Sequence, residues 1–191
     1  MTAFLNDLER KNSTYYRNSG IEVLGRIPWG SHFLFFFESH NELKEILLPY
    51  FAAGLRNDEF CLWIIPENYG LQDARDLLRE NIPRIEDPFK NGQVEIIPND
   101  VWYDKDYFFN AKKMLGKWID KLEAALQRGF KGLRALGCVA PLNQEQWKNF
   151  QDYEETINNN IKNYRMMTIC AYERKEYDIT DVIDVAYNHQ S

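Results

Sequence analysis

Short runs of apolar residues alternate along this chain with longer segments in which apolar residues recur every three or four positions. The first run, Phe33 to Phe37, is continuous and has polar neighbours, which is typical of a strand buried on both faces. The next segment places Leu43, Leu47 and Phe51 on one face of an amphipathic helix that ends near Gly54. Strands that alternate with helices need crossover connections, so the sequence predicts a parallel sheet.

The same alternation continues toward the end of the chain. We expect further strands at residues 60–65, 94–97, 133–139 and 167–172, and helices at residues 71–78, 108–127, 147–164 and 179–187. Pro66 and Pro98 end two of the strands, and Gly129 ends the long third helix. The predicted fold class is therefore a three-layer α/β domain with a mostly parallel sheet of five or more strands and helices on both faces.

One domain accounts for most of the chain. A length of 191 residues suits a single hydrophobic core, and no internal repeat or low-complexity linker divides the sequence. We expect residues 1–20 to form an N-terminal extension with a helix, and residues 21–191 to form a single domain. The main loops are expected at residues 83–92 and 99–106.

Charge and composition exclude several classes of function. The formal net charge of -6 and the absence of a basic cluster argue against direct binding of nucleic acid. The N-terminus has no signal-peptide pattern, and no apolar stretch reaches the roughly 20 residues that cross a bilayer, so we expect a cytoplasmic protein without a membrane anchor. The three cysteines form no closely spaced pair, which favours buried, reduced thiols.

A nucleotide site would need a glycine-rich turn after a strand. The first buried strand is instead followed by Glu38, Ser39 and His40, which carry no glycine and a negative charge. The glycine at Gly30 precedes that strand and lies at the wrong end of it. The sequence therefore predicts no ATP hydrolysis, no cofactor and, in the leading interpretation, no enzyme.

Histidine and cysteine offer a weaker chemical signal. His32, His40 and His189 are not spaced with a second ligand as in helical metal motifs, so no metal site is predicted. His32 and Cys170 would approach each other if their strands are neighbours. They would then form either a base–nucleophile pair or a structural histidine beside an inert thiol.

Parallel sheets bind ligands beyond the carboxyl ends of their strands, and this rule supplies a list of candidate positions. Trp102 and Tyr103 follow the third strand, where they form either an aromatic lid or core packing. Glu154 and Asn158 share one helix face, which either contacts a ligand or is solvated. The positions expected at this edge are Glu38, Ser39, His40, Glu67, Asn68, Asn99, Asp100, Trp102, Tyr103, Asn143, Glu173 and Arg174.

Taken in order, several segments resemble the MEDS family, the sensory domain of methanogen and methylotroph regulators named after the dichloromethane regulator. The resemblance runs from about residue 28 to residue 189, and the ordered set is more specific than any single motif. The segments that carry it are Gly30–His32, Leu43–Leu55, Glu59–Trp63, Trp102–Tyr103, Gly129–Arg134, Tyr153–Glu154 with Asn158, Cys170–Glu173 and Asn188–His189.

The resemblance implies a RecA/KaiC-like, Rossmann-like domain without a phosphate-binding loop that senses small organic molecules, including hydrocarbon derivatives. Of the residues expected to bind a ligand, His32 and Cys170 match positions characteristic of the family, and Tyr153, Glu154 and Asn158 match its helical motif. The full set is His32, Trp102, Tyr103, Arg134, Tyr153, Glu154, Asn158 and Cys170. The sequence departs from the family pattern after Arg134, where Cys138 and Pro141 replace the usual approach to an Asn and a Trp. This departure weakens the prediction of a ligand contact from that strand end.

Family members are often joined to DNA-binding or histidine-kinase domains, and the final predicted helix here leads directly to Ser191. The leading hypothesis is therefore a standalone sensory module that binds a small organic ligand and signals through a separate partner, such as a histidine kinase or a transcription regulator. One alternative is a non-catalytic interaction or scaffold protein, for which a homodimer would be evidence. A third is an enzyme that uses Cys170 or a residual nucleotide site.

Overall fold

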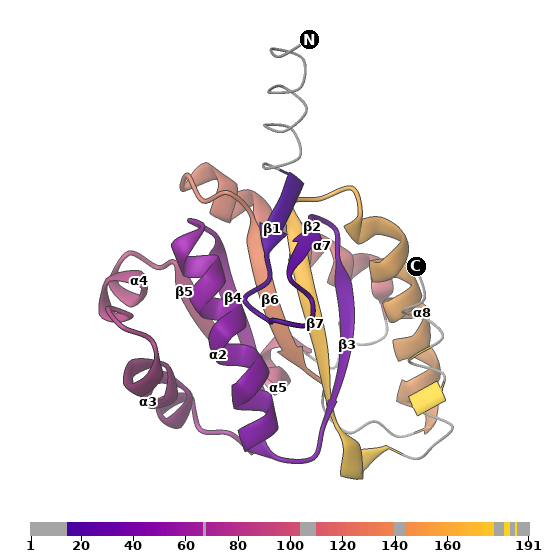
Figure 1. Ribbon diagram of the computed structural model, residues 1–191. Helices are drawn as coiled ribbons and strands as arrows, with labels where there is room; N and C mark the ends of the chain where they lie inside the picture. The colour runs from indigo at the N-terminus through magenta and orange to yellow at the C-terminus, as the bar shows by residue number, and fades with distance from the viewer. Residues whose placement is uncertain are drawn as a thin grey trace.

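The computed structural model describes residues 15–66, 68–103, 110–139, 144–177, 182, 183 and 186. Its centre is a sheet of five strands that all pair in parallel (Figure 1). In spatial order, the strands are β3 (His32–Phe37), β7 (Met166–Glu173), β6 (Leu133–Cys138), β4 (Phe60–Ile65) and β5 (Val94–Pro98). Each predicted strand is present, and the parallel sheet is confirmed.

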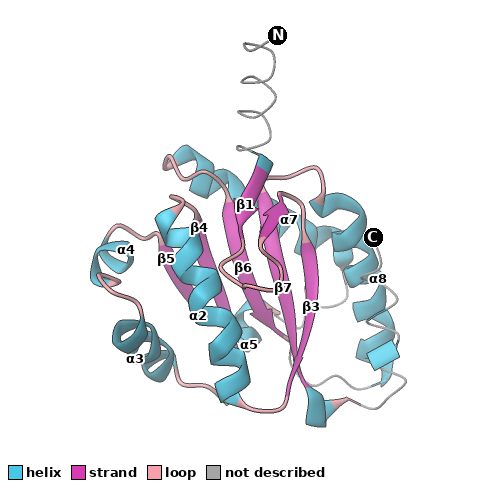
Figure 2. Ribbon diagram, in the orientation of Figure 1, coloured by secondary structure: helices cyan, strands magenta, loops and turns pink. Residues whose placement is uncertain are grey.

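Helices cover both faces of the sheet (Figure 2). On one face, α2 (His40–Arg56) and α3 (Leu71–Asn81) bury Leu47, Phe51 and Leu78 against the strands. On the other face, α7 (Ala111–Gln127) and α8 (Gln144–Ile161) contribute a second apolar cluster. These two clusters make the three layers of the predicted α/β fold, which the structure confirms.

The inner strands are buried on both faces because they consist almost entirely of apolar residues. Every residue of β4 and of β6 is buried, and side chains that alternate along them enter opposite clusters. Arg134 of β6 is the exception to the apolar pattern, since its side chain is fully buried. Its charge therefore needs partners inside the protein.

A two-stranded antiparallel hairpin, β1 (Tyr16–Asn18) and β2 (Arg26–Pro28), precedes the main sheet. This hairpin was not predicted, and residues 1–20 were expected to form an extension with a helix, because its strands are only three residues long and are polar. Arg134 fixes the hairpin by donating to the carbonyl oxygens of Asn18 and Ser19 at 2.8 and 2.7 Å. The folded part thus includes residues before Ile21, while residues 1–14 lie outside the described residues.

Short helices occupy parts of the two predicted loops. They are α4 (Glu86–Lys90) and α5 (Asn99–Trp102), and a 3-10 turn, η1 (Arg174–Glu176), follows β7. The predicted last helix, residues 179–187, lies outside the described residues except at 182, 183 and 186, which are helical. Among the described helices, none combines the length and the apolar character that a membrane span requires.

Candidate functional site

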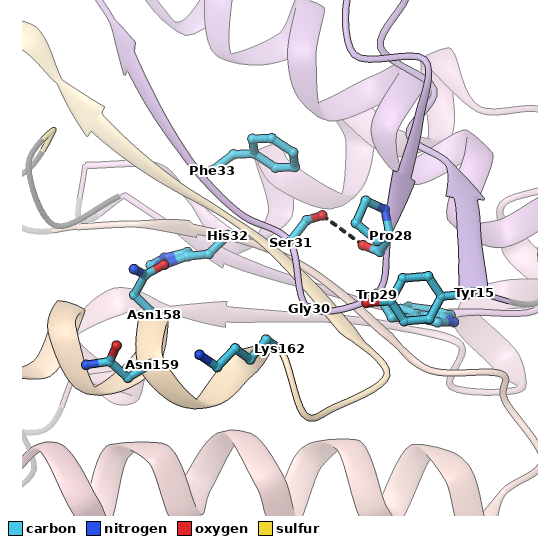
Figure 3. A pocket seen from close by; sticks show the side chains of 10 residues that line it. All are labelled: Tyr15, Pro28, Trp29, Gly30, Ser31, His32, Phe33, Asn158, Asn159 and Lys162. Carbon is cyan, nitrogen blue, oxygen red and sulfur yellow. Dashed lines mark hydrogen bonds between the residues drawn. The ribbon is translucent and has the colours of Figure 1, made fainter. Parts of the chain in front are cut away.

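A cavity of about 280 Å³ opens at the amino end of β3 (Figure 3). Its walls come from the β2–β3 connection and from the C-terminal end of α8. The lining residues are Tyr15, Pro28, Trp29, Gly30, Ser31, His32, Phe33, Asn158, Asn159 and Lys162. This volume lies near the lower end of the range for small-molecule sites and combines aromatic, amide and cationic groups.

The connection that forms one wall has a defined backbone. Gly30 has a φ of +85°, and a Cβ at this position would lie 2.5 Å from the Lys162 Cα, so a side chain is excluded there. Its N–H donates to the carbonyl of Met166 at 2.7 Å. The Ser31 hydroxyl donates to the Pro28 carbonyl at 2.8 Å. Gly30 thus brings this wall of the cavity close to the end of α8.

Behind the cavity, three ionisable side chains meet between the sheet and α8. His32 Nε2 lies 3.1 Å from the Cys170 Sγ and 3.5 Å from Glu154 Oε2. The side chains of His32 and Glu154 are each only 1% exposed, and Cys170 is 4% exposed. We call His32, Glu154 and Cys170 the His–Glu–Cys cluster.

The sheet register explains this meeting. His32, the first residue of β3, pairs with Thr168 of β7, and Cys170 lies two residues further along β7 on the same face. Glu154 reaches the pair from the buried face of α8. Tyr172, two residues after Cys170, donates its hydroxyl to Glu154 Oε1 at 3.1 Å. The contact between His32 and Cys170 that the sequence left open is therefore present.

Burial keeps the Cys170 thiol protonated. Desolvation raises its pKa well above the ordinary value, and the neighbouring Glu154 raises it further. A protonated, buried thiol is a poor nucleophile. The geometry also differs from a catalytic relay, because Cys170 and Glu154 both face the same nitrogen of His32, whereas a relay uses the two ring nitrogens for different partners.

Three more of the predicted site residues form an adjoining aromatic cluster. The Trp118 indole donates to the Tyr153 hydroxyl at 2.9 Å, and Trp102 packs edge-on against Trp118 with centroids 4.6 Å apart. Tyr103 also hydrogen-bonds Tyr153. Burial raises the pKa of both tyrosines well above the usual value. Trp102 and Tyr103 are thus core residues here, and residues 104–109 lie outside the described residues.

The structure separates Arg134 from the other predicted site residues. Its side chain lies on the opposite face of the sheet, beneath α2, where Nε donates to Glu59 at 2.6 Å and Nη1 to the Tyr50 carbonyl at 3.0 Å. Glu59 also accepts from Arg17 at 2.7 Å. This buried ion pair ties β6 to the hairpin and leaves Arg134 far from the cavity wall.

Asn158 lines the cavity, a contact that its spacing from Glu154 left open, and the rest of the wall was not foreseen. The ligand site was expected at the carboxyl ends of the strands, whereas the cavity lies at the amino end of β3. Trp29, Ser31, Asn159 and Lys162 were not among the predicted ligand-binding residues. The glycine at position 30, followed by a serine and a histidine, was the available signal for a close backbone approach. Part of the carboxyl edge, including residues 67 and 140–143, lies outside the described residues.

The turn where a phosphate cradle would sit is closed by side chains of the protein. Ser39 caps α2 by accepting from the Glu42 N–H at 3.3 Å, and Glu42 Oε2 accepts from the Glu38 N–H at 2.9 Å. A carboxylate therefore occupies the helix N-terminus that an anion would need. This geometry disfavours a triphosphate at the β3–α2 turn.

Comparison with known proteins gives one family and two informative structures. The family model described as "MEthanogen/methylotroph, DcmR Sensory domain" matches residues 31–190. A KaiC-like protein from Pyrococcus horikoshii superposes with a TM-score of 0.54 at 18% identity, covering 82% of this chain and 70% of that one. The flagellar accessory protein FlaH from Methanocaldococcus jannaschii gives a TM-score of 0.54 at 12% identity, covering 86% and 70%. No curated protein matches the chain. The structural likeness concerns the fold alone.

Proposed function

This chain belongs to the MEDS family of sensory domains, and from that membership together with the cavity we propose that it binds a small organic molecule at the amino end of β3. The observation that carries the proposal is the cavity between the β2–β3 connection and α8. A volume of about 280 Å³ corresponds to roughly nine water molecules, so it suits a compact ligand. Trp29 and Tyr15 offer aromatic surface, and Asn158, Asn159 and Lys162 offer polar groups.

The proposal assigns no catalytic step to the chain and places it in the cytoplasm. Three features support a binding role rather than catalysis. The Cys170 thiol is buried and its pKa is raised, His32 is not arranged as a relay, and the N-terminus of α2 is capped by Ser39 and Glu42. The resemblance to KaiC-like structures therefore supports a shared fold and not a shared reaction.

The β1–β2 hairpin connects the cavity to the core through a series of side-chain contacts. Trp29 lines the cavity, and the Arg17 guanidinium lies over its ring at 5.3 Å. Arg17 in turn pairs with Glu59, which pairs with Arg134 in the core. A ligand that moves Trp29 would therefore disturb this chain of ion pairs. We place the output of the sensor on the hairpin.

The exposed side of the hairpin suits contact with a separate partner. Val23 is 88% exposed and Tyr16 is 39% exposed, although both are large and apolar. A histidine kinase or a transcription regulator that binds this surface would bind differently when the hairpin changes position. Signalling requires that the ligand bind one hairpin position more tightly than the other.

Thermal unfolding with a panel of small compounds tests the binding proposal. The panel contains dichloromethane, methanol, methylamine and phenol, with Mg-ATP as a separate arm. A compound at 100 times its Kd adds about 2.7 kcal/mol of stability, which raises the Tm of a chain of this size by roughly 5–10 °C. We expect such a shift with at least one organic compound and none with Mg-ATP.

A cavity-filling variant locates the binding. Ser31→Phe places a ring in the cavity and should abolish the shift, while Glu155→Phe, which adds the same ring at an exposed position of α8 away from the cavity wall, should retain it. An equal shift in both variants would reject the cavity as the site. A shift with Mg-ATP alone would support the nucleotide-binding alternative.

A further inference from the structure

We propose that His32, Glu154 and Cys170 bind a zinc ion through the His32 Nε2, the Glu154 carboxylate and the Cys170 Sγ. The three ligand atoms lie within 4.8 Å of one another and come from β3, α8 and β7. This zinc site is separate from the proposed binding of an organic molecule. Neither the geometry of the zinc site nor its test depends on that organic ligand. No metal motif was predicted, because the three residues are far apart along the chain and only the fold brings them together.

The spacing of the ligand atoms is close to that of a tetrahedral zinc site. With Zn–N near 2.0–2.1 Å, Zn–O near 2.0–2.2 Å and Zn–S near 2.3 Å, neighbouring ligand atoms are about 3.3–3.6 Å apart. The observed separations from His32 Nε2 are 3.1 Å to the Cys170 Sγ and 3.5 Å to Glu154 Oε2. The third separation, between the Cys170 Sγ and the Glu154 carboxylate, is at most 4.8 Å, so the ligands would close around the ion by about 1 Å or less.

The direction of the side chains supports coordination. The Cys170 Sγ and Glu154 Oε2 both approach the same atom, His32 Nε2, at 3.1 and 3.5 Å. Ligands of a metal likewise all face one point. Imidazole, thiolate and carboxylate together form a donor set that zinc accepts.

Charge balance gives an independent reason. A neutral imidazole, a thiolate and a carboxylate carry two negative charges, which a divalent cation cancels. At a site this buried, two adjacent anions would be costly without a cation to neutralise them. Zinc binding therefore releases the Cys170 proton, because a coordinated thiol is deprotonated.

The surroundings already orient one ligand. Tyr172 donates to Glu154 Oε1 at 3.1 Å, and this bond leaves Oε2 facing His32. Such outer hydrogen bonds hold metal ligands in place, and their loss weakens metal binding about 10–100-fold. Three protein ligands leave one position of a tetrahedron for water. Because His32 also lines the cavity, the zinc site and the cavity adjoin.

Cobalt titration of the metal-free chain tests the site. The whole chain is purified under reducing conditions, stripped with a chelator and titrated with Co²⁺ in place of zinc. We expect saturation at one equivalent, with a thiolate-to-cobalt charge-transfer band and the intense visible bands of a four-coordinate ion. Added Zn²⁺ should abolish these bands by displacing the cobalt.

Matched variants identify the ligands. Cys170→Ala should remove the charge-transfer band, and Cys138→Ala should keep it, although Cys138 is an equally buried thiol on the opposite face of the sheet. Tyr172→Phe keeps all three ligands and should weaken cobalt binding by about 10–100-fold. Circular dichroism checks that each variant is folded.

Two results would overturn the proposal. One is the absence of a charge-transfer band in the folded wild-type chain at saturating Co²⁺. The other is a band that persists in Cys170→Ala or disappears in Cys138→Ala. If His32→Ala fails to fold, Cys170→Ala and its control Cys138→Ala still decide the case, because both variants keep His32.

Discussion

Removing Glu59 should destabilise the protein more than almost any other single polar substitution, because Glu59 neutralises a buried arginine. Both side chains of the Arg134–Glu59 pair are completely buried, and their contact is 2.6 Å. Arg134 also donates to three carbonyl oxygens, from Asn18, Ser19 and Tyr50. The guanidinium is thus fixed in place and cannot reach solvent when its partner is lost.

The magnitude follows from that geometry. Breaking a buried ion pair by removing one partner costs about 3–5 kcal/mol, since the remaining charge stays buried without compensation. Glu59→Gln leaves two arginines, Arg134 and Arg17, without their shared carboxylate. Arg134→Met removes the positive charge, but it also removes the donor from the three carbonyl oxygens. Each oxygen that stays unsatisfied would cost about 1–3 kcal/mol of stability.

Urea unfolding followed by tryptophan fluorescence measures these effects. We expect Glu59→Gln to lower the free energy of unfolding by about 3–5 kcal/mol. The exposed control variants Glu155→Gln and Arg165→Met should change it by no more than about 0.5 kcal/mol. In the double variant with Arg134→Met, the loss should be smaller than the sum of the single losses by about 1–3 kcal/mol. A loss below about 1 kcal/mol in Glu59→Gln, or strict additivity, would show that Arg134 does not depend on Glu59 for its stability in the core.

Three further predictions follow from the packing. Gly54→Ala should cost about 1–3 kcal/mol in urea unfolding, because its Cβ would lie 2.7 Å from the Arg134 Cδ; an unchanged midpoint would show that Arg134 can move. Tyr153→Phe should cost about 1–3 kcal/mol, because it leaves the buried Trp118 indole without an acceptor, whereas a neutral result would mean that water replaces the hydroxyl. In the metal-free chain, burial raises the pKa of all three thiols, so the folded state holds their protons longer than the unfolded state. Stability should therefore be complete below about pH 8.5 and fall as the pH rises above it, and a thiol reagent should label the cysteines only after unfolding; rapid labelling of the native chain would contradict this.

Much of the fold could be predicted because it depends on local patterns. The apolar run at residues 33–37 and the proline after residue 65 are strand signals that need no knowledge of the rest of the chain. The strand order could not be predicted, because it depends on which crossovers pack best. The β1–β2 hairpin was missed because distant contacts, chiefly those of Arg134, stabilise its short polar strands.

The candidate site was predicted in part. The family resemblance selected His32, Glu154 and Cys170, which the structure brings together, but periodicity alone could not show that they share a face. Arg134 was misplaced among them, because a single sequence does not show toward which face of a buried strand a charge points. The cavity was expected at the carboxyl ends of the strands, yet its walls depend on how Gly30 approaches α8.

The most direct test of the account is a two-dimensional amide NMR titration of the labelled chain with those panel compounds that raise the Tm. If the compounds bind in the cavity at the amino end of β3, the largest shifts come from the amides of Gly30, Ser31, His32 and Asn158. Shifts centred on Glu38 and Glu173, at the carboxyl ends of β3 and β7, with Ser31 unchanged, would contradict it.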